Sequence, residues 1–305
     1  AEPVDRESFE AVEQGLRAKL PDLVKTYGPD MVNGMFTAPT DASRGMYDFL
    51  LRLEGEMFRA GVRVSPYLST HPLTSERVDT VANHLALSRY SDAPTAPNLV
   101  EADRRIRAKL MGFTQPLDVT LRRYPESDNS IAARYARAIA WYRVPDLARA
   151  LPLVDGLIRD EPDNPYFHEL KGQMLIESGK VTESIAPYQK AVDIAPDEPL
   201  LEFALAKAQI ETNDPALTEP ARKHLESALQ TDPDMAGAWR LLTVAYSRLG
   251  LDGETALAQA QYSLLLGERS QAKALATRAM DLLPQGSPGW LRAQDIVSQF
   301  DRKKS

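Results

Sequence analysis

The sequence contains no cysteine, which excludes thiol catalysis, disulfide bonds and zinc sites built on cysteine. An absence of thiols suits an oxidising compartment, but many cytoplasmic proteins share it, so the compartment stays open. No apolar run approaches the roughly 18–20 residues that a membrane-spanning helix needs. The 36 basic and 43 acidic residues are mixed along the chain, with a net charge of −7. Beyond the terminal Arg302-Lys303-Lys304 no basic cluster occurs, so binding to nucleic acid is not expected.

The short motifs of several enzyme classes are also missing. No G-x-S-x-G, no G-x-x-x-x-G-K-[ST] and no G-x-G-x-x-G occurs, so neither a serine nucleophile nor a nucleotide-binding loop is predicted. Alternating runs of β-branched residues are absent as well. Apolar residues instead recur at three- and four-residue spacing. This pattern predicts an all-α fold with helices in Ser8–Val24, Met46–Phe58, Ser75–Leu87 and Leu99–Met111.

A repeat occupies the second half of the chain. The phrases "RDEPDNPYF", "DIAPDEPLL" and "QTDPDMAGAW" recur around Pro162, Pro196 and Pro233. The first two of these prolines are 34 residues apart and the last two are 37 apart. A period of this length fits two helices of about 12–14 residues and two turns. Such a unit cannot bury its apolar faces alone and therefore stacks on its neighbours.

Fixed positions within the units match the tetratricopeptide (TPR) repeat. Small residues stand where the two helices of a unit meet, at Ala138, Gly172 and Ala206. The fourth unit, "AWRLLTVAYSRLG", has the W-x-x-L-x-x-x-Y pattern, and the third carries an insertion in the turn "ETNDPALTEP". After Gly250 the phase drifts: one more helix pair ends at Pro284, and "SPGWLRAQDIVSQF" reads as a capping helix. These features predict a TPR superhelix, an α-solenoid.

A linker divides the predicted domains. Residues 91–98, "SDAPTAPN", combine two prolines with small and polar residues, as loops do. Residues 1–90 then form a helical N-terminal segment. Residues 99–305 form the TPR-like repeat domain with its capping helix.

The N-terminal segment resembles a known family. "GMYDFLLRLEGEMFRAGVRVSPYLSTHPLTSERV" is similar to the end of the peptidase domain in gluzincin-type zinc metallopeptidases, where an "fL-x-x-L" helix leads to S-T-H-P-x-x-x-x-R. "TLRRYPESDNSIAARYARAIAWYR" and "LLPQGSPGWLRAQDI" resemble the TPR tail of the periplasmic members that act in outer-membrane assembly. The resemblance covers about residues 43–300. It implies a short remnant of a peptidase domain, a periplasmic location, and partners among β-barrel outer-membrane proteins and their assembly machinery.

The zinc motif of that family is absent from this chain. In H-E-x-x-H two histidines bind zinc from one helix face, and the glutamate activates the zinc-bound water. Only His168 is followed by glutamate, and Gly172 stands where the second histidine would be. We interpret His168-Glu169 as chance, because it falls in the first helix of the second repeat. No cofactor is therefore predicted here, although the intact family uses zinc. Three explanations stay open: a zinc domain upstream, a zinc domain cut out or left out, or a degenerate, non-proteolytic relative.

His71 lies between Thr70 and Pro72 in a stiff stretch of the sequence. Pro72 favours extended backbone at His71, and Pro66 stiffens the approach. In an intact relative, the resemblance implies, this loop would lie beside the active-site cleft. His71 could there be a fourth zinc ligand that displaces the attacking water and acts as a reversible plug. The alternative is a structural histidine that hydrogen-bonds to backbone and fixes the loop.

The first helices of TPR units line the concave face of the array, where such modules hold peptides. Exposed tyrosines suit such a wall, because tyrosine contributes contact area at low entropy cost, although these rings could also pack between repeats. Projection of the repeat gives ten candidate peptide-binding residues: Tyr135, Ile139, Tyr142, Tyr166, Glu169, Gln173, Phe203, Lys207, Ile210 and Arg240. The set that clamps a C-terminal carboxylate in some TPR proteins is not matched at Ala136, Leu170, Ala204 and Leu241.

Three functions remain possible from the sequence. The first is a TPR protein-interaction module of a periplasmic metallopeptidase-like protein in outer-membrane protein assembly or quality control. The second is an active zinc metalloendopeptidase whose zinc-binding residues lie outside the given sequence. The third is a free-standing TPR scaffold that binds protein clients.

Overall fold

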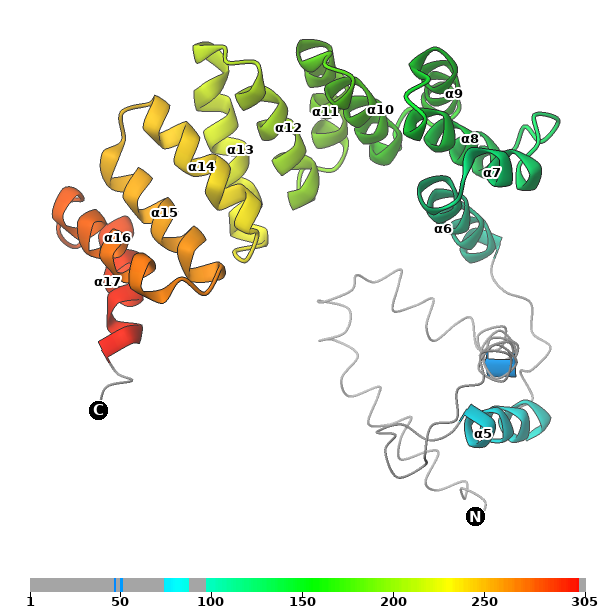
Figure 1. Cartoon of the computed structure of the whole chain (residues 1–305), viewed down its shortest axis with the longest axis horizontal. Helices are drawn as coiled ribbons and strands as arrows, with labels where there is room; N and C mark the ends of the chain where they lie inside the picture. The colour runs from blue at the N-terminus through cyan, green and yellow to red at the C-terminus, as the bar shows by residue number, and fades with distance from the viewer. Residues whose placement is uncertain (1–46, 48–49, 52–73, 88–96, 302–305) are drawn as a thin grey trace. The chain divides into compact units, whose positions relative to one another are not determined.

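A computed structural model describes Tyr47, Leu50, Leu51 and residues 74–87 and 97–301 (Figure 1). The chain divides into two compact units, residues 1–106 and residues 107–305, and each is described by itself. The described residues form helices and loops and contain no β-strand. The predicted all-α fold class is therefore confirmed for this part of the chain. None of the described helices is long and apolar enough to cross a membrane.

The first unit contains α5 (Thr74–Leu87), which matches the predicted helix Ser75–Leu87. The long helix α6 (Pro97–Thr114) contains the predicted Leu99–Met111. Residues 91–96 of the predicted linker lie outside the described residues, whereas the last two linker residues begin α6. The domain boundaries at 90 and 98 stay predictions, and the proposed peptidase remnant lies largely outside the described residues.

The second unit is a stack of helices, each packed against the next from α7 to α17 (Figure 1). The short helix α7 spans Leu117–Arg123. The next six form three pairs: α8 (Ile131–Arg143) with α9 (Leu147–Asp160), α10 (Pro165–Glu177) with α11 (Val181–Ile194), and α12 (Pro199–Glu211) with α13 (Thr218–Thr231). Four more helices follow: α14 (Ala236–Arg248), α15 (Asp252–Leu265), α16 (Arg269–Leu282) and α17 (Pro288–Asp301). The predicted TPR superhelix is confirmed.

One kind of turn joins α8 to α9 and α10 to α11, and a hydrogen bond to the carbonyl five residues back closes it. At the end of α10 the N–H of Lys180 donates to the carbonyl of Leu175 over 2.9 Å, and Gly179 has φ +77°. This is a Schellman motif, in which glycine takes the left-handed conformation that other residues avoid. The proline phrases make the turns between pairs, and Asn164 caps α10 by accepting from the N–H of Tyr166 at 3.1 Å. The predicted insertion in the third repeat is the short 3₁₀ helix η1 (Pro215–Leu217).

Between α14 and α16 the turn within a pair no longer alternates with the turn between pairs. The N–H of Leu251 donates to Tyr246 O at the end of α14, and the N–H of Glu268 donates to Ser263 O at the end of α15, both over 2.9 Å. The within-pair turn is thus used twice in succession. Pro284 follows Pro233 by 51 residues, which is one and a half periods of 34. Helix α15 is therefore the second helix of one pair and the first of the next, which explains the drift after Gly250.

Small residues let the paired helices approach closely. Ala138 and Ala206 have no exposed surface, and Gly172 lies against the ring of Tyr188 in α11. Leucines, alanines and aromatic rings fill the core on both sides of these contacts.

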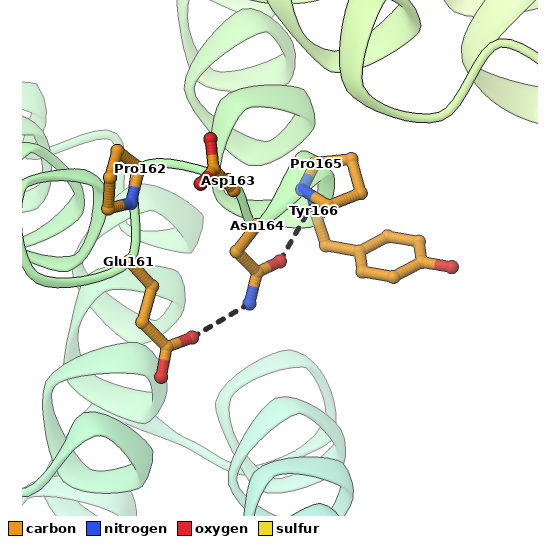
Figure 2. Close-up of a pocket in the computed structure, with 6 residues that line it drawn as sticks. All are labelled: Glu161, Pro162, Asp163, Asn164, Pro165 and Tyr166. Atoms are coloured by element: carbon orange, nitrogen blue, oxygen red, sulfur yellow. Dashed lines mark hydrogen bonds between the residues drawn. The ribbon is translucent and has the colours of Figure 1, made fainter. Parts of the chain in front are cut away.

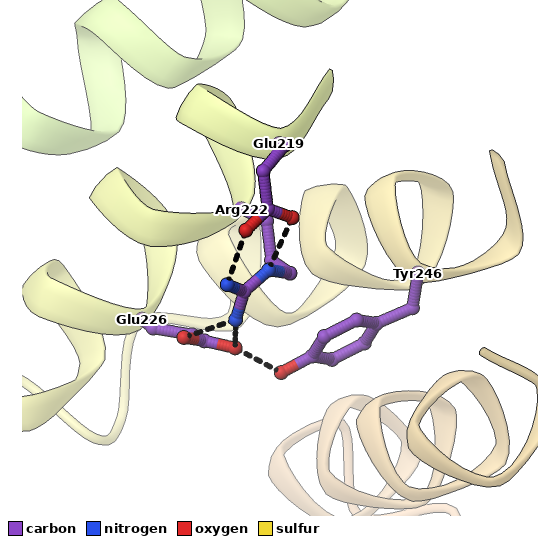
Figure 3. Close-up of polar contacts among 4 residues, drawn as sticks. All are labelled: Glu219, Arg222, Glu226 and Tyr246. Carbon is purple, nitrogen blue, oxygen red and sulfur yellow. Dashed lines mark hydrogen bonds and ion pairs between the residues drawn. The ribbon is translucent and has the colours of Figure 1, made fainter. Parts of the chain in front are cut away.

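A polar cluster joins α13 to α14 at the edge of this core (Figure 3). The Arg222 guanidinium contacts the carboxylates of Glu219 and Glu226 at 2.6 Å each. The hydroxyl of Tyr246 donates to Glu226 Oε1, also at 2.6 Å. This hydrogen bond links the two helices across their interface.

Candidate peptide-binding surface

Helices α10, α12 and α14 form the inner side of the second unit. On the inner side of a curved stack alternate helices approach one another, and here α10 contacts α12 directly and α12 contacts α14. This is the face on which the sequence places the ten candidate residues. The structure distributes these residues unequally between surface and core.

The three candidates on α8 are buried. Tyr135, Ile139 and Tyr142 have only 5%, 0% and 8% of their surface exposed. The ring of Tyr135 packs edge-on against Phe167, with 5.4 Å between ring centroids. These side chains form the floor of the surface and present almost no area to a ligand.

The end of helix α6, from residue 107 onward, belongs to the second unit and packs against α8. A β-carbon on Gly112 would lie 2.8 Å from Cβ of Ile139, so the two helices nearly touch there. Ala108 packs with Ala132 and Ala136 of α8 in the same contact. Glycine and alanine allow such an approach because they place no bulk between the helix backbones. The sequence could not predict this contact, because α6 lies outside the repeat that was projected.

On α10 the candidates form an accessible stripe. Tyr166 is 48% exposed, and Glu169 and Gln173 are partly exposed on the same side of the helix. Their spacing of three and four residues places all three on one helix face. Glu177, one turn further, is exposed and was not predicted from the sequence. It accepts hydrogen bonds from the Gln173 amide at 3.0 Å and from the hydroxyl of Tyr142.

Helices α12 and α14 continue the stripe. Phe203 and Lys207 are partly exposed, and the Lys207 ammonium pairs with Glu211 at 3.8 Å. Arg240 of α14 is exposed, whereas Ile210 is buried at 5%. Leu200, 63% exposed, lies 34 residues after Tyr166 and was missed. The repeat period itself could have found it, since it occupies the same position in its unit.

Two shallow depressions flank the stripe on α10. The first is formed by the turn before this helix, Glu161 to Tyr166, where the Asn164 amide donates to Glu161 at 3.0 Å (Figure 2). The Tyr166 ring points away from the other residues of that turn (Figure 2). The second, about 420 Å³ in volume, lies between the end of α10 and the end of α6. Its lining includes Phe113, Gln173 and Glu177.

We call the resulting set the inner surface. It consists of accessible residues from the first helices of the repeats, together with two residues of α6 that border them. Its members are Lys109, Phe113, Tyr166, Glu169, Gln173, Glu177, Leu200, Phe203, Lys207 and Arg240. Apolar and aromatic groups alternate with charges of both signs, which suits a protein segment better than a small molecule.

Comparisons with known proteins agree with the helices. A family model of the tetratricopeptide repeat matches residues 135–199. Over 263 residues the chain is 26% identical to the beta-barrel assembly-enhancing protease of Yersinia pestis, which covers 85% of this chain and 53% of the relative. A Vibrio cholerae relative is 25% identical over 266 residues, with the same coverage. The chain contains TPR repeats and is similar to beta-barrel assembly-enhancing proteases. It spans about half the length of the curated relatives it matches.

Solved structures of other repeat proteins superpose in part. The TPR protein YrrB, described as having an unusual peptide-binding site, is 14% identical with a TM-score of 0.46, covering 59% of this chain and 96% of that one. The structure named MamA MSR-1 C2 is 17% identical with a TM-score of 0.43, covering 59% and 95%.

The described histidines do not form a zinc site. The described residues contain no group of three or more side chains that could hold a metal ion. His168 hydrogen-bonds to the carbonyl of Pro162 at 2.8 Å, and His224 pairs with the buried Glu202. Both imidazoles therefore stabilise the repeat. His71 lies outside the described residues, so its role as a conditional zinc ligand or plug stays a prediction.

Proposed function

We propose that this chain is the protein-binding module of a periplasmic metallopeptidase-like protein in the assembly or quality control of outer-membrane β-barrel proteins. Its inner surface would hold an extended segment of a client or of the assembly machinery. The observation that carries this proposal is the continuous stripe on α10 and α12. Tyr166 and Glu169 on α10 are followed 34 residues later by Leu200 and Phe203.

The chemistry of the inner surface supports an extended, amphipathic ligand. Strands of outer-membrane barrels alternate apolar and polar side chains, so a single unfolded strand offers both kinds to a binding wall. Leu200 and Phe203 provide apolar contact area, while Gln173 and Lys207 provide hydrogen-bonding groups beside it. The name of the Yersinia pestis relative, a beta-barrel assembly-enhancing protease, supports the choice of client.

A second candidate is an active zinc metalloendopeptidase. It is favoured by the word protease in the name of that relative and by the relative's length, about twice what this chain matches. The zinc ligands and the peptidase activity would then belong to residues outside the given sequence, and the TPR repeats would deliver the substrate. A free-standing TPR scaffold would use the same inner surface without proteolysis.

Binding of fluorescent peptides from the strands of an outer-membrane β-barrel protein tests the proposal. Tyr166→Ala combined with Phe203→Ala should weaken binding by at least about tenfold, because aromatic anchors dominate such interfaces. The matched control is Leu291→Ala, a residue that is 47% exposed on α17 and does not belong to the inner surface. Equal binding by the double variant and the wild type would overturn the proposal.

A further inference from the structure

Glu169 is an unusual member of the inner surface. It is partly buried in the middle of α10, yet within the described part of the chain it takes part in no hydrogen bond and no ion pair. The acidic residues near it are satisfied differently: Glu177 accepts two hydrogen bonds, and Glu211 pairs with Lys207. A partly desolvated carboxylate without a partner is costly, and it gains most from an added cation.

Tyrosines occur on α10, the helix of Glu169, and on two helices that pack against it. Tyr135 is on the adjacent helix α8, Tyr166 is one turn before Glu169 on α10, and Tyr188 is on α11. Burial, and after it the charge of Glu169, raises the pKa of Tyr135 and Tyr188. The field of the carboxylate therefore reaches several phenol groups at once. Aromatic faces beside a carboxylate favour a cation, because the ring quadrupole and the negative charge both attract it.

A neighbouring cation, Lys109, does not satisfy Glu169. The Lys109 ammonium lies over the Tyr166 ring, 6.0 Å from its centroid. Its charge partly offsets the rise that burial causes in the pKa of Glu169, but the two groups form no ion pair within 4.0 Å. Lys109 is exposed and belongs to α6, which borders the inner surface. The position of Lys109 shows that an ammonium can approach the Tyr166 ring without forming an ion pair with Glu169.

We propose that Glu169 selects a lysine or arginine side chain of the bound segment, whose cation lies between the carboxylate and the Tyr166 ring. This inference rests on the proposed function of the inner surface as a protein-binding wall. The inner surface would then prefer positively charged side chains, a preference that the repeat fold alone does not require. An acidic side chain at the same place would be repelled, so the site also discriminates against that class.

The test begins with a random library of twelve-residue peptides selected on the whole chain. Synthetic copies of the enriched peptides are then compared with copies that carry norleucine in place of each lysine, which keeps the aliphatic stem and removes the ammonium. Wild-type protein should bind the lysine form at least about tenfold more tightly. With Glu169→Gln, which keeps the shape of the side chain, the two forms should bind within about twofold of each other. Glu183→Gln on α11, an exposed glutamate paired with Lys180, is the control and should retain the wild-type preference.

A second variant should change peptide affinity in the opposite direction. Lys109→Met removes the neighbouring cation and should tighten binding of the lysine peptide by about two- to threefold, since less repulsion opposes the incoming ammonium. Weaker binding would mean that Lys109 itself contacts the segment, which overturns the assignment to Glu169.

The outcomes separate this inference from the proposed function. If selection enriches no peptide, the protein-binding role fails and this inference fails with it. If peptides are enriched but the wild type binds the norleucine and lysine forms equally, only the inference fails. The same holds if Glu169→Gln keeps the preference for lysine.

Discussion

Gly172 of α10 lies so close to the ring of Tyr188 in α11 that a β-carbon at residue 172 would be 2.8 Å from three ring carbons. Real side chains do not tolerate such a contact, and Tyr188 is buried and cannot swing away freely. We expect Gly172→Ala to lower the free energy of unfolding by about 1–3 kcal/mol through overpacking. Urea unfolding followed by circular dichroism measures this change.

Gly156 of α9 is the matched control for that substitution. A β-carbon there would meet only the end of the Arg134 side chain, at 3.4 Å. Gly156→Ala should therefore stabilise the protein by about 0.5–1 kcal/mol, because alanine is the better helix former. Substitution of glycine by alanine should thus lower the free energy of unfolding at residue 172 and raise it at residue 156. Equal effects at both would contradict the packing described for α10 and α11.

Replacement of Tyr135 should mainly lower stability, whereas replacement of Tyr166 should mainly weaken peptide binding. Tyr135 is 5% exposed and packs on Phe167, so Tyr135→Ala should cost about 3–5 kcal/mol of unfolding free energy, as for other large buried aromatics. Tyr166 is 48% exposed, and its replacement by alanine should change stability far less while it weakens peptide capture. Thermal melts and peptide binding on both variants check this. A large loss of stability in Tyr166→Ala would assign that ring to the core.

Alkaline pH should destabilise the repeats. Burial raises the pKa of Tyr188 above its unfolded value of about 10, so above that pH the unfolded chain loses the proton first. Stability is fully present below pH 10 and falls as pH rises, by roughly 1.4 kcal/mol per pH unit for each such tyrosine. Urea unfolding from pH 9 to 11.5 measures the slope. Tyr188→Phe should make it shallower, and an unchanged slope would exclude Tyr188 as a source.

Glu226 should contribute more to stability than Glu219, although both pair with Arg222. Glu226 also accepts the hydrogen bond from Tyr246 and so connects α13 to α14. Glu226→Ala should cost about 1 kcal/mol, a value kept low by its partial exposure. Glu219→Ala leaves the link between the helices intact and should cost less. A double-mutant cycle with Tyr246→Phe should place most of the loss in the hydrogen bond to Tyr246.

The sequence predicts the helices of the repeat region because their signals are local. Proline phrases end one helix and start the next, and small residues at Gly172 and Ala206 mark the contact within each pair. The inner surface depends on a contact that no local pattern contains. The end of α6 lies against Ile139 of α8, and Phe113 and Lys109 of α6 border the inner surface. A repeat projected onto itself cannot reveal a helix that lies outside the period.

The change in the order of turns between α14 and α16 would limit the length of ligand that the inner surface can hold. The alternation that builds the inner surface runs only over α10, α12 and α14, since α6 packs against α8 at one end and α15 changes its role at the other. Neighbouring helix axes are about 8–10 Å apart, so these helices and their partners offer a track of roughly 20–30 Å. An extended chain advances about 3.3 Å per residue, and the track therefore accommodates about six to nine residues. Under the proposed function, peptides lengthened beyond this footprint should gain no affinity, and the inner surface would hold single strands rather than hairpins.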